Sequence, residues 1–131
     1  MASRFDNWEY PLIEENKLNE YHWLVQHKNN LKLGYKTDIG AFTYINAKNG
    51  ITIEDYVQIG SHCSLYTIST IDNKEGPITL RKNCKIGSHS TIMPNVTVGN
   101  NSIIGAHSFV NKNIPDDVVA FGVPIKIIKS I

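Results

Sequence analysis

The chain has 131 residues, with 13 basic and 12 acidic side chains and a formal net charge of +1 at pH 7. This length is typical of one domain, and so balanced a charge argues against a nucleic-acid-binding protein. No stretch of 18 apolar residues is present and the N-terminus lacks the apolar core of a signal peptide, so we expect no membrane partner.

Residues 1–30 precede any repeat and are expected to form a capping segment. Helix-forming residues over 12–25, directly after Pro11, predict one short helix. The aromatic side chains of this segment are too apolar for a free tail, so we expect them to cover the open end of the next domain or a neighbouring subunit. They are Trp8, Tyr10, Tyr21 and Trp23.

From Leu33 onwards an apolar residue recurs at every sixth position, with shifts at two places. A period of six fits neither a helix nor a simple strand, but it fits a parallel solenoid in which three short strands make one turn. We therefore expect residues 31–131 to form an all-β solenoid of about four coils with a C-terminal tail. The repeat predicts three ladders of stacked core residues: Leu33/Ile53/Leu80/Val98, Ile39/Ile59/Ile86/Ile104 and Ile45/Leu65/Ile92/Val110.

Smaller residues follow each ladder residue by four positions and are expected to fill the narrow interior between the large ones. Both cysteines take such positions, which predicts buried, reduced thiols and a cytoplasmic protein. The glycines that follow many ladder residues are expected to allow tight corners or close contact between coils. The small inward residues are Thr43, Val57, Cys63, Cys84, Ser90, Val96, Ser102 and Ser108.

Residues 71–79 are an insertion in the repeat, rich in Asp, Asn, Gly and Pro, and they predict one protruding loop. Loops on solenoids commonly lie on the binding face. We therefore take Asp72 and Glu75 as candidates for orienting the amine or hydroxyls of an acceptor.

Histidines recur at one offset of successive coils, at His62, His89 and His107, with Phe42 at the equivalent place of an earlier coil. Neighbouring coils of such a solenoid lie ~4.8 Å apart, so these side chains are expected to be neighbours. The set is open to three interpretations: a general base, a divalent-metal site, or polar packing in a subunit interface. We rank a base at His62 or His89 first, interface packing second and metal last. His22 and His27 are expected to be surface or capping residues.

The repeat ends near Pro115. Residues 118–124 predict a tight turn, and residues 125–128 predict a short final strand that covers the lower end of the solenoid.

Residues 85–106, together with the ending over 110–115 and 120–128, resemble the hexapeptide-repeat acyltransferases, in the branch of the sugar acetyltransferases. The resemblance implies a left-handed parallel β-helix and a homotrimer with its active sites between subunits. It also implies acetyl-CoA as the acyl donor, without fixing the acceptor. Our hypothesis for the acceptor is a sugar, possibly nucleotide-linked, and we expect no metal, because histidines stacked in parallel do not converge readily on one ion.

Acetyl-CoA-binding positions are carried over from the family motif by motif. The pantetheine arm is expected beside two residues that follow the glycines of successive coils, and the nucleotide is expected near the tail. Lysine side chains suit phosphate oxygens as point charges. The carried-over positions are Ser88, Ala106, Asn111, Lys112, Pro124 and Lys126.

One departure from the family concerns the base. In galactoside and maltose acetyltransferases the catalytic histidine lies in the loop before a Pro-Ile-x-Ile segment, whereas residues 66–76 contain no histidine. The base would then be His62 or His89, with backbone amides near Ser88 stabilising the oxyanion. Because a neutral amine needs less help than a hydroxyl, we favour N-acetylation of an amino sugar. Sugar O-acetylation, a metal-dependent trimer like a carbonic anhydrase and a non-catalytic trimeric scaffold are the alternatives.

Overall fold

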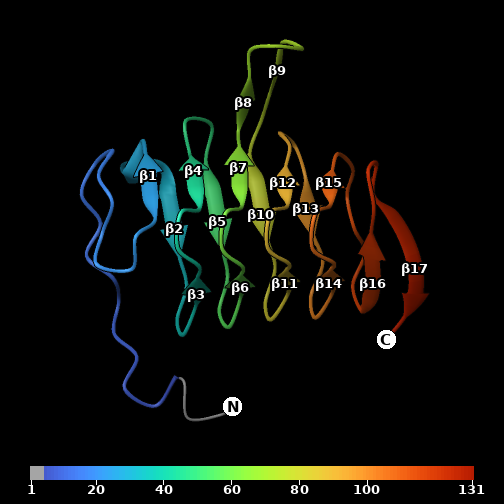
Figure 1. The fold of residues 1–131 in the computed structure, drawn as a ribbon, viewed down its shortest axis with the longest axis horizontal. Helices are drawn as coiled ribbons and strands as arrows, with labels where there is room; N and C mark the ends of the chain where they lie inside the picture. Colours follow the sequence, from blue (N-terminus) through green and yellow to red (C-terminus); the bar gives the residue numbers. More distant parts are fainter. Residues whose placement is uncertain (1–4) are drawn as a thin grey trace.

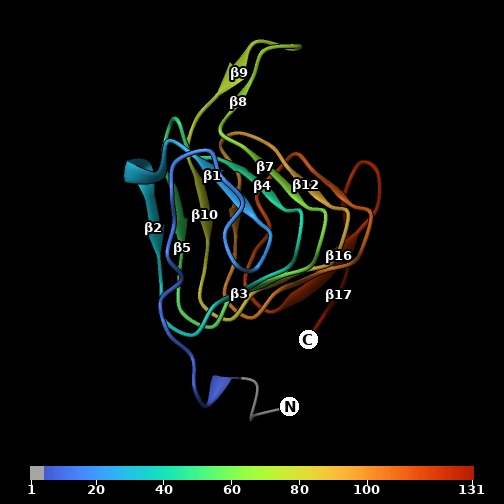
Figure 2. The ribbon, with the colours of Figure 1, turned by 60° about the vertical axis from the view of Figure 1, so that its left-hand side comes forward.

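The computed structural model describes residues 5–131 and shows a parallel β-solenoid of about five turns (Figure 1). Its coils stack one behind another around a common interior, and three sheets form its sides (Figure 2). Sheet A consists of β1 (Leu24–Gln26), β4 (Tyr44–Asn46), β7 (Ser64–Tyr66), β12 (Thr91–Ile92) and β15 (Phe109–Val110). Sheet B consists of β2 (Leu31–Leu33), β5 (Ile51–Ile53), β10 (Ile78–Leu80) and β13 (Thr97–Val98). Sheet C consists of β3 (Asp38–Ile39), β6 (Gln58–Ile59), β11 (Lys85–Ile86), β14 (Ile103–Ile104), β16 (Val118–Phe121) and β17 (Lys126–Ser130).

The three predicted ladders are confirmed by the strand register. In sheet B, Ile53 pairs with both Leu33 and Leu80, and Leu80 pairs with Val98. The other two ladders pair in the same way in sheets C and A. All ladder residues except Leu33, which is partly buried, are buried, so the core is a continuous column along the solenoid axis.

The predicted small inward residues are also buried, and their hydroxyl groups have hydrogen-bond partners. Thr43 Oγ1 donates to the carbonyl of Gly60 at 3.0 Å, and Ser108 Oγ donates to the carbonyl of Gly105 at 2.7 Å. Both cysteines are buried free thiols, as expected. A buried polar group with a partner carries little penalty, so these side chains fit the interior.

Close contact between coils, rather than tight turning, explains the repeated glycines. A Cβ atom on Gly60 would lie 2.6 Å from the backbone nitrogen of Ser88 in the next coil, and one on Gly34 would lie 2.7 Å from that of Asp55. Neither glycine has a positive φ angle; the left-handed residues at the corners are others, such as Tyr56 and His62. These glycines therefore allow neighbouring coils to approach one another.

The predicted helix over residues 12–25 is wrong, because this segment forms turns and then β1. Asn16 and His22 have left-handed φ angles of 57° and 67°, which a right-handed helix does not allow. The Asn19 side chain accepts hydrogen bonds from the backbone N–H groups of Tyr21 and Trp23, an arrangement that competes with helix formation. A short 3₁₀ helix, η2 (Lys28–Asn30), follows β1.

The first coil begins earlier than the repeat in the sequence indicates. β1 pairs in parallel with β4, with Val25 opposite Ile45, so it belongs to sheet A although it lies within residues 1–30. This adds a turn to the predicted count of about four coils. Trp23, directly before β1, is only 2% exposed and joins the core.

A protruding loop is present as predicted, but its bounds differ from the predicted 71–79: it is a hairpin of β8 (Ile68–Ser69) and β9 (Lys74–Glu75) that projects from the solenoid (Figure 1). Ile78 and Thr79 belong instead to β10, where Ile78 pairs with Ile51 and is buried. At the C-terminal end, β16 continues sheet C and β17 folds back antiparallel against it. The turn between them contains a cis peptide bond at Val123–Pro124 and buries Ile125. Among the residues described, no helix has the length and apolar character needed to cross a bilayer.

Candidate functional site

Five aromatic rings follow one another along the corner between sheets C and A, and the three histidines at the C-terminal end are stacked; we call the five rings the histidine column. The rings of His62 and His89 lie 4.7 Å apart and are nearly parallel, at 2°, and those of His89 and His107 lie 4.8 Å apart at 15°. Phe42 contacts His62 at 5.3 Å, and His22 contacts Phe42 at 6.2 Å. Each ring is exposed, because each residue has a left-handed φ angle at a corner that directs it outward.

The geometry of the column favours single bases over a metal site within one chain. Parallel stacked rings present their nitrogen atoms side by side and do not converge on one point, as a tetrahedral site requires. Within residues 5–131, no group of three or more His, Cys, Asp or Glu side chains has an arrangement that could hold a metal ion. A neutral imidazole in the column remains able to take a proton from the hydroxyl or amine of a bound substrate.

The outer face of sheet A carries a pocket of about 490 Å³ at the base of the hairpin, which we call the sheet-A pocket. Tyr44 and Tyr66 form its floor, with ring centroids 5.5 Å apart. Tyr44 Oη donates to Gln26 Oε1 at 2.5 Å, and Asn46 Nδ2 donates to Tyr44 Oη at 3.2 Å. Residues 68–72 of the hairpin and Met93 complete the lining. An aromatic floor with a few fixed polar groups is typical of a small-molecule site.

Two asparagines hold the two roots of the hairpin. Asn49 Nδ2 donates to the carbonyl of Thr67 at 2.8 Å, at the root of β8. Asn95 Nδ2 donates to the carbonyl of Glu75 at 3.0 Å, at the end of β9, and its side chain packs against Gly76. The hairpin is therefore anchored to the solenoid on both sides of the sheet-A pocket.

Of the two predicted acceptor-orienting carboxylates, Asp72 lines the sheet-A pocket and Glu75 does not. A hydrogen bond from Ser69 lowers the pKa of Asp72, with a smaller contribution from Lys74, whose Nζ lies 3.6 Å from Asp72 Oδ2. Asp72 is thus held as a carboxylate, able to accept hydrogen bonds from hydroxyl groups.

Three predicted acetyl-CoA positions lie together near the C-terminal end of the histidine column. Ser88 and Ala106 stack in successive coils, and the N–H of His107 donates to the carbonyl of Ser88 at 2.9 Å. Among the described residues, the N–H groups of Ser88 and Ala106 have no acceptor; Ser88 is half-buried and Ala106 is exposed. Lys126 pairs with Phe121, whose side chain packs beside Gly105.

The other three predicted acetyl-CoA positions lie elsewhere. Asn111 and Lys112 are exposed and follow β15, at the end of this strand that lies away from His107. Pro124 lies beside β15, because the N–H of the next residue, Ile125, donates to the carbonyl of Phe109 at 3.0 Å. A ligand that contacted all six positions would extend along β15.

The histidine column and the sheet-A pocket are separate within one chain. His62 lies at the corner before β7 and Tyr66 ends this three-residue strand, which spans ~10 Å. No member of the histidine column lines the sheet-A pocket. One chain therefore does not bring the predicted bases, His62 and His89, to the predicted acceptor residue Asp72.

Sequence reasoning missed Tyr44, Asn46, Tyr66 and His22. The first three occupy outward positions of sheet A, a signal present in the alternation of each short strand. His22 lies three positions before Val25, just as His62 lies three positions before Leu65. That shared offset is the signal that was overlooked, because the segment was expected to be helical.

Comparison with known proteins gives consistent results. The family model described as "Bacterial transferase hexapeptide (six repeats)" matches residues 77–112. The chain is 56% identical over 55 residues to the galactoside O-acetyltransferase of Escherichia coli (strain K12), a match covering 42% of this chain and 27% of that protein. It is 32% identical over 113 residues to the galactoside O-acetyltransferase of Lactococcus lactis, covering 75% of this chain and 55% of that protein.

Two solved structures share the fold. A galactoside acetyltransferase in complex with coenzyme A has a TM-score of 0.77 at 32% identity, with 90% of this chain and 64% of that chain covered. An acetyltransferase from Vibrio cholerae complexed with acetyl coenzyme A has a TM-score of 0.77 at 27% identity, with 82% and 64% covered. The chain spans 27% and 55% of the two curated relatives named above.

Proposed function

Since this chain belongs to the hexapeptide-repeat family of bacterial transferases, we propose that it transfers the acetyl group of acetyl-CoA to a hydroxyl group of a sugar. The observation that carries the proposal is the sheet-A pocket, whose tyrosine floor and polar edge suit a sugar ring. The flat C–H face of a pyranose packs against an aromatic ring, while its hydroxyls bond to polar groups at the edge. Asn46 and Asp72 supply such groups.

The relatives favour a hydroxyl acceptor over the amine acceptor that the missing loop histidine led us to expect. Both curated relatives named above are called O-acetyltransferases. An N-acyltransferase from Bacillus cereus that shares the fold is only 23% identical, so it supports the fold and not the acceptor. N-acetylation of an amino sugar therefore has less support than O-acetylation.

Acetyl-CoA fits the residues around the C-terminal end of the histidine column. The unused N–H groups of Ser88 and Ala106 are donors for the amide carbonyls of the pantetheine arm. Lys112 and Lys126 are exposed and suit the phosphates, with Asn111 and Pro124 on either side of β15. Structures of relatives contain acetyl coenzyme A or coenzyme A, which supports this part of the proposal.

In the proposed reaction, His62 or His89 takes the proton of the sugar hydroxyl as its oxygen attacks the thioester carbonyl carbon. A backbone N–H near Ser88 stabilises the resulting oxyanion. The carbon–sulfur bond then breaks, the acetyl ester remains on the sugar, and the imidazolium returns its proton to the coenzyme A sulfur. Such a base contributes roughly 10²–10⁴-fold to the rate.

The separation of the histidine column from the sheet-A pocket leads us to propose that neighbouring copies complete each site. One copy would supply the column and the acetyl-CoA contacts, and the next would supply the sheet-A pocket and its hairpin. A homotrimer with three such sites satisfies this arrangement, since a closed ring gives every copy both neighbours.

The test begins with calorimetric titration of the purified chain with acetyl-CoA, followed by acetylation assays with methyl galactoside and with glucosamine. We expect saturable binding near one site per chain and acetyl transfer to the galactoside. His62→Ala and His89→Ala are compared with His107→Ala, a ring of the same column that is not proposed as the base. One of the first two should lower kcat by roughly 10²–10⁴-fold. Wild-type turnover in both variants would exclude the base, and absence of acetyl-CoA binding would exclude the whole proposal.

A further inference from the structure

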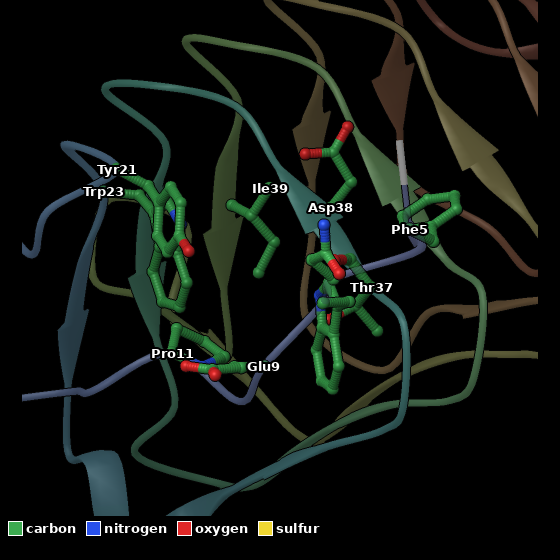
Figure 3. A pocket seen from close by; sticks show the side chains of 10 residues that line it. Phe5, Glu9, Pro11, Tyr21, Trp23, Thr37, Asp38 and Ile39 are labelled. Carbon is green, nitrogen blue, oxygen red and sulfur yellow. The ribbon is translucent and has the colours of Figure 1, made fainter. Parts of the chain in front are cut away.

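A second pocket, of about 340 Å³, lies at the N-terminal end of the solenoid (Figure 3). It forms where residues 5–11 pass along β3, the edge strand of sheet C, and meet the turn that contains Tyr21 and Trp23. We call it the N-terminal pocket. It shares no lining residue with the sheet-A pocket and includes no member of the histidine column. The acetyl-transfer site therefore does not account for it.

Aromatic side chains form the walls of the N-terminal pocket. The rings of Tyr21 and Trp23 lie on one side of it and Phe5 on the other, with Asp38 between them (Figure 3). Trp8 also lines it and is held in place, because its Nε1–H donates to the carbonyl of Thr37 at 2.7 Å. Edge-to-face contacts with two tyrosines, at centroid distances of 4.7 and 5.6 Å, fix the Trp8 ring further. The walls are thus ordered before any ligand binds, which lowers the entropic cost of binding.

The charged side chains of the described lining are both carboxylates, Glu9 and Asp38. Burial raises the pKa of Tyr21, with smaller contributions from the charges of Glu20 and Glu9. The Glu9 carboxylate would repel a phosphate or carboxylate group placed beside it. The polar lining also includes the Asn7 side chain, which can both donate and accept. The pocket therefore suits a ligand that has an apolar face, many hydrogen-bond donors and no negative charge.

We propose that the N-terminal pocket binds one residue of a neutral or amino saccharide. The C–H face of the pyranose would pack against the Trp8 and Tyr21 rings, and its hydroxyl or amino groups would donate to the carboxylate of Glu9 and the side-chain oxygen of Asn7. The volume lies at the small end of the range for ligand sites, which fits one ring and excludes a nucleotide-linked sugar. This second saccharide site does not depend on the proposed acetyl transfer.

The chain offers a direct readout for this site. Its two tryptophans, Trp8 and Trp23, both line the N-terminal pocket, so intrinsic tryptophan fluorescence reports on the surroundings of this pocket. The sheet-A pocket contains no tryptophan, so ligand binding there has no direct effect on the tryptophan fluorescence.

The experiment titrates the full chain with methyl galactoside and glucosamine, and compares them with galacturonate, glucose 6-phosphate and choline. We expect a saturable fluorescence change with the first two and at least roughly tenfold weaker binding of the two anions. Glu9→Gln should weaken saccharide binding by roughly tenfold or more, because a hydrogen bond to a charged acceptor is lost. Glu14→Gln, an exposed glutamate outside the pocket, is the matched control and should bind as the wild type does.

Three results would overturn the proposal: no fluorescence change with either sugar up to ~100 mM, saturable binding of choline alone, or wild-type binding by Glu9→Gln. The acetylation assay separates this proposal from the previous one. Glu9→Gln should retain full acetyl transfer while its saccharide-dependent fluorescence change is reduced.

Discussion

Substitution of one inter-coil glycine tests how tightly the coils are packed. In Gly60→Ala, the added Cβ would lie 2.6 Å from the Ser88 nitrogen and 2.8 Å from its Cα, whereas ordinary contact begins at 3.4 Å. The Ser88 backbone must therefore move by up to 0.8 Å, the difference between 3.4 Å and 2.6 Å. This backbone is held by a hydrogen bond from the N–H of His107 to the Ser88 carbonyl, so it cannot move alone.

The expected cost is that of overpacking a close-packed interior, about 1–3 kcal/mol. With a typical unfolding entropy per residue, a chain of this length loses roughly 4–11 °C of Tm for that cost. Thermal unfolding followed by circular dichroism measures the shift, and Ser61→Ala is the control, since it removes an oxygen next to Gly60 and adds no atom. We expect the control to lie within about 2 °C of the wild type.

The same variant should bind acetyl-CoA more weakly, because the Ser88 N–H is displaced from its place beside Ala106. An unchanged Tm in Gly60→Ala would refute the argument from close approach between coils. A lowered Tm with unchanged acetyl-CoA affinity would leave the packing argument intact and would remove Ser88 from the proposed site.

The remaining predictions concern the hairpin, the N-terminal segment and the thiols. Asn95→Ala removes the hydrogen bond that holds one root of the hairpin, so it should raise KM for the sugar by several-fold and leave acetyl-CoA affinity unchanged. Steady-state kinetics measures KM and calorimetry measures the acetyl-CoA affinity. Equal weakening of both would contradict the anchoring role. Backbone N–H groups of Lys28 and His27 lower the pKa of Glu15 from its ordinary 4.5, so its stabilising effect is present above that pH and is lost as pH falls further. The decrease in Tm on acidification should therefore be smaller in Glu15→Gln than in the wild type. Identical pH profiles of Tm in the two proteins would argue against this role of Glu15. Burial raises the pKa of Cys63, and that of Cys84 to about 12, so both thiols should react with iodoacetamide only on unfolding; rapid labelling of the native chain, followed by mass spectrometry, would contradict their burial.

The solenoid could be predicted from the sequence because each of its contacts repeats. A ladder residue such as Ile86 meets the residue one coil before it, Ile59, and the residue one coil after it, Ile104, so a single local pattern specifies the core. The hairpin followed from the same pattern, as the place where the period fails. The stacking of the histidines followed too, since equal offsets in equal coils place side chains in line.

The parts outside the repeat required the tertiary structure. The segment over 12–25 has helix formers, but the Asn19 side chain and the burial of Trp23 against the first coil override that local preference. The two pockets join segments that no periodicity relates: the hairpin with Tyr44 and Tyr66, and residues 5–11 with β3.

The sequence by itself therefore determined the coil, its core and the line of histidines, because in a solenoid these depend on neighbours at a constant separation. Only the tertiary structure decided that His22 extends the column, that the histidine column and the sheet-A pocket lie at opposite ends of the same strands, and that both tryptophans line one acidic pocket. Those arrangements depend on where non-repeating segments pack, and packing of that kind is set by shape and burial across the whole molecule rather than by the order of residues along any one part of it.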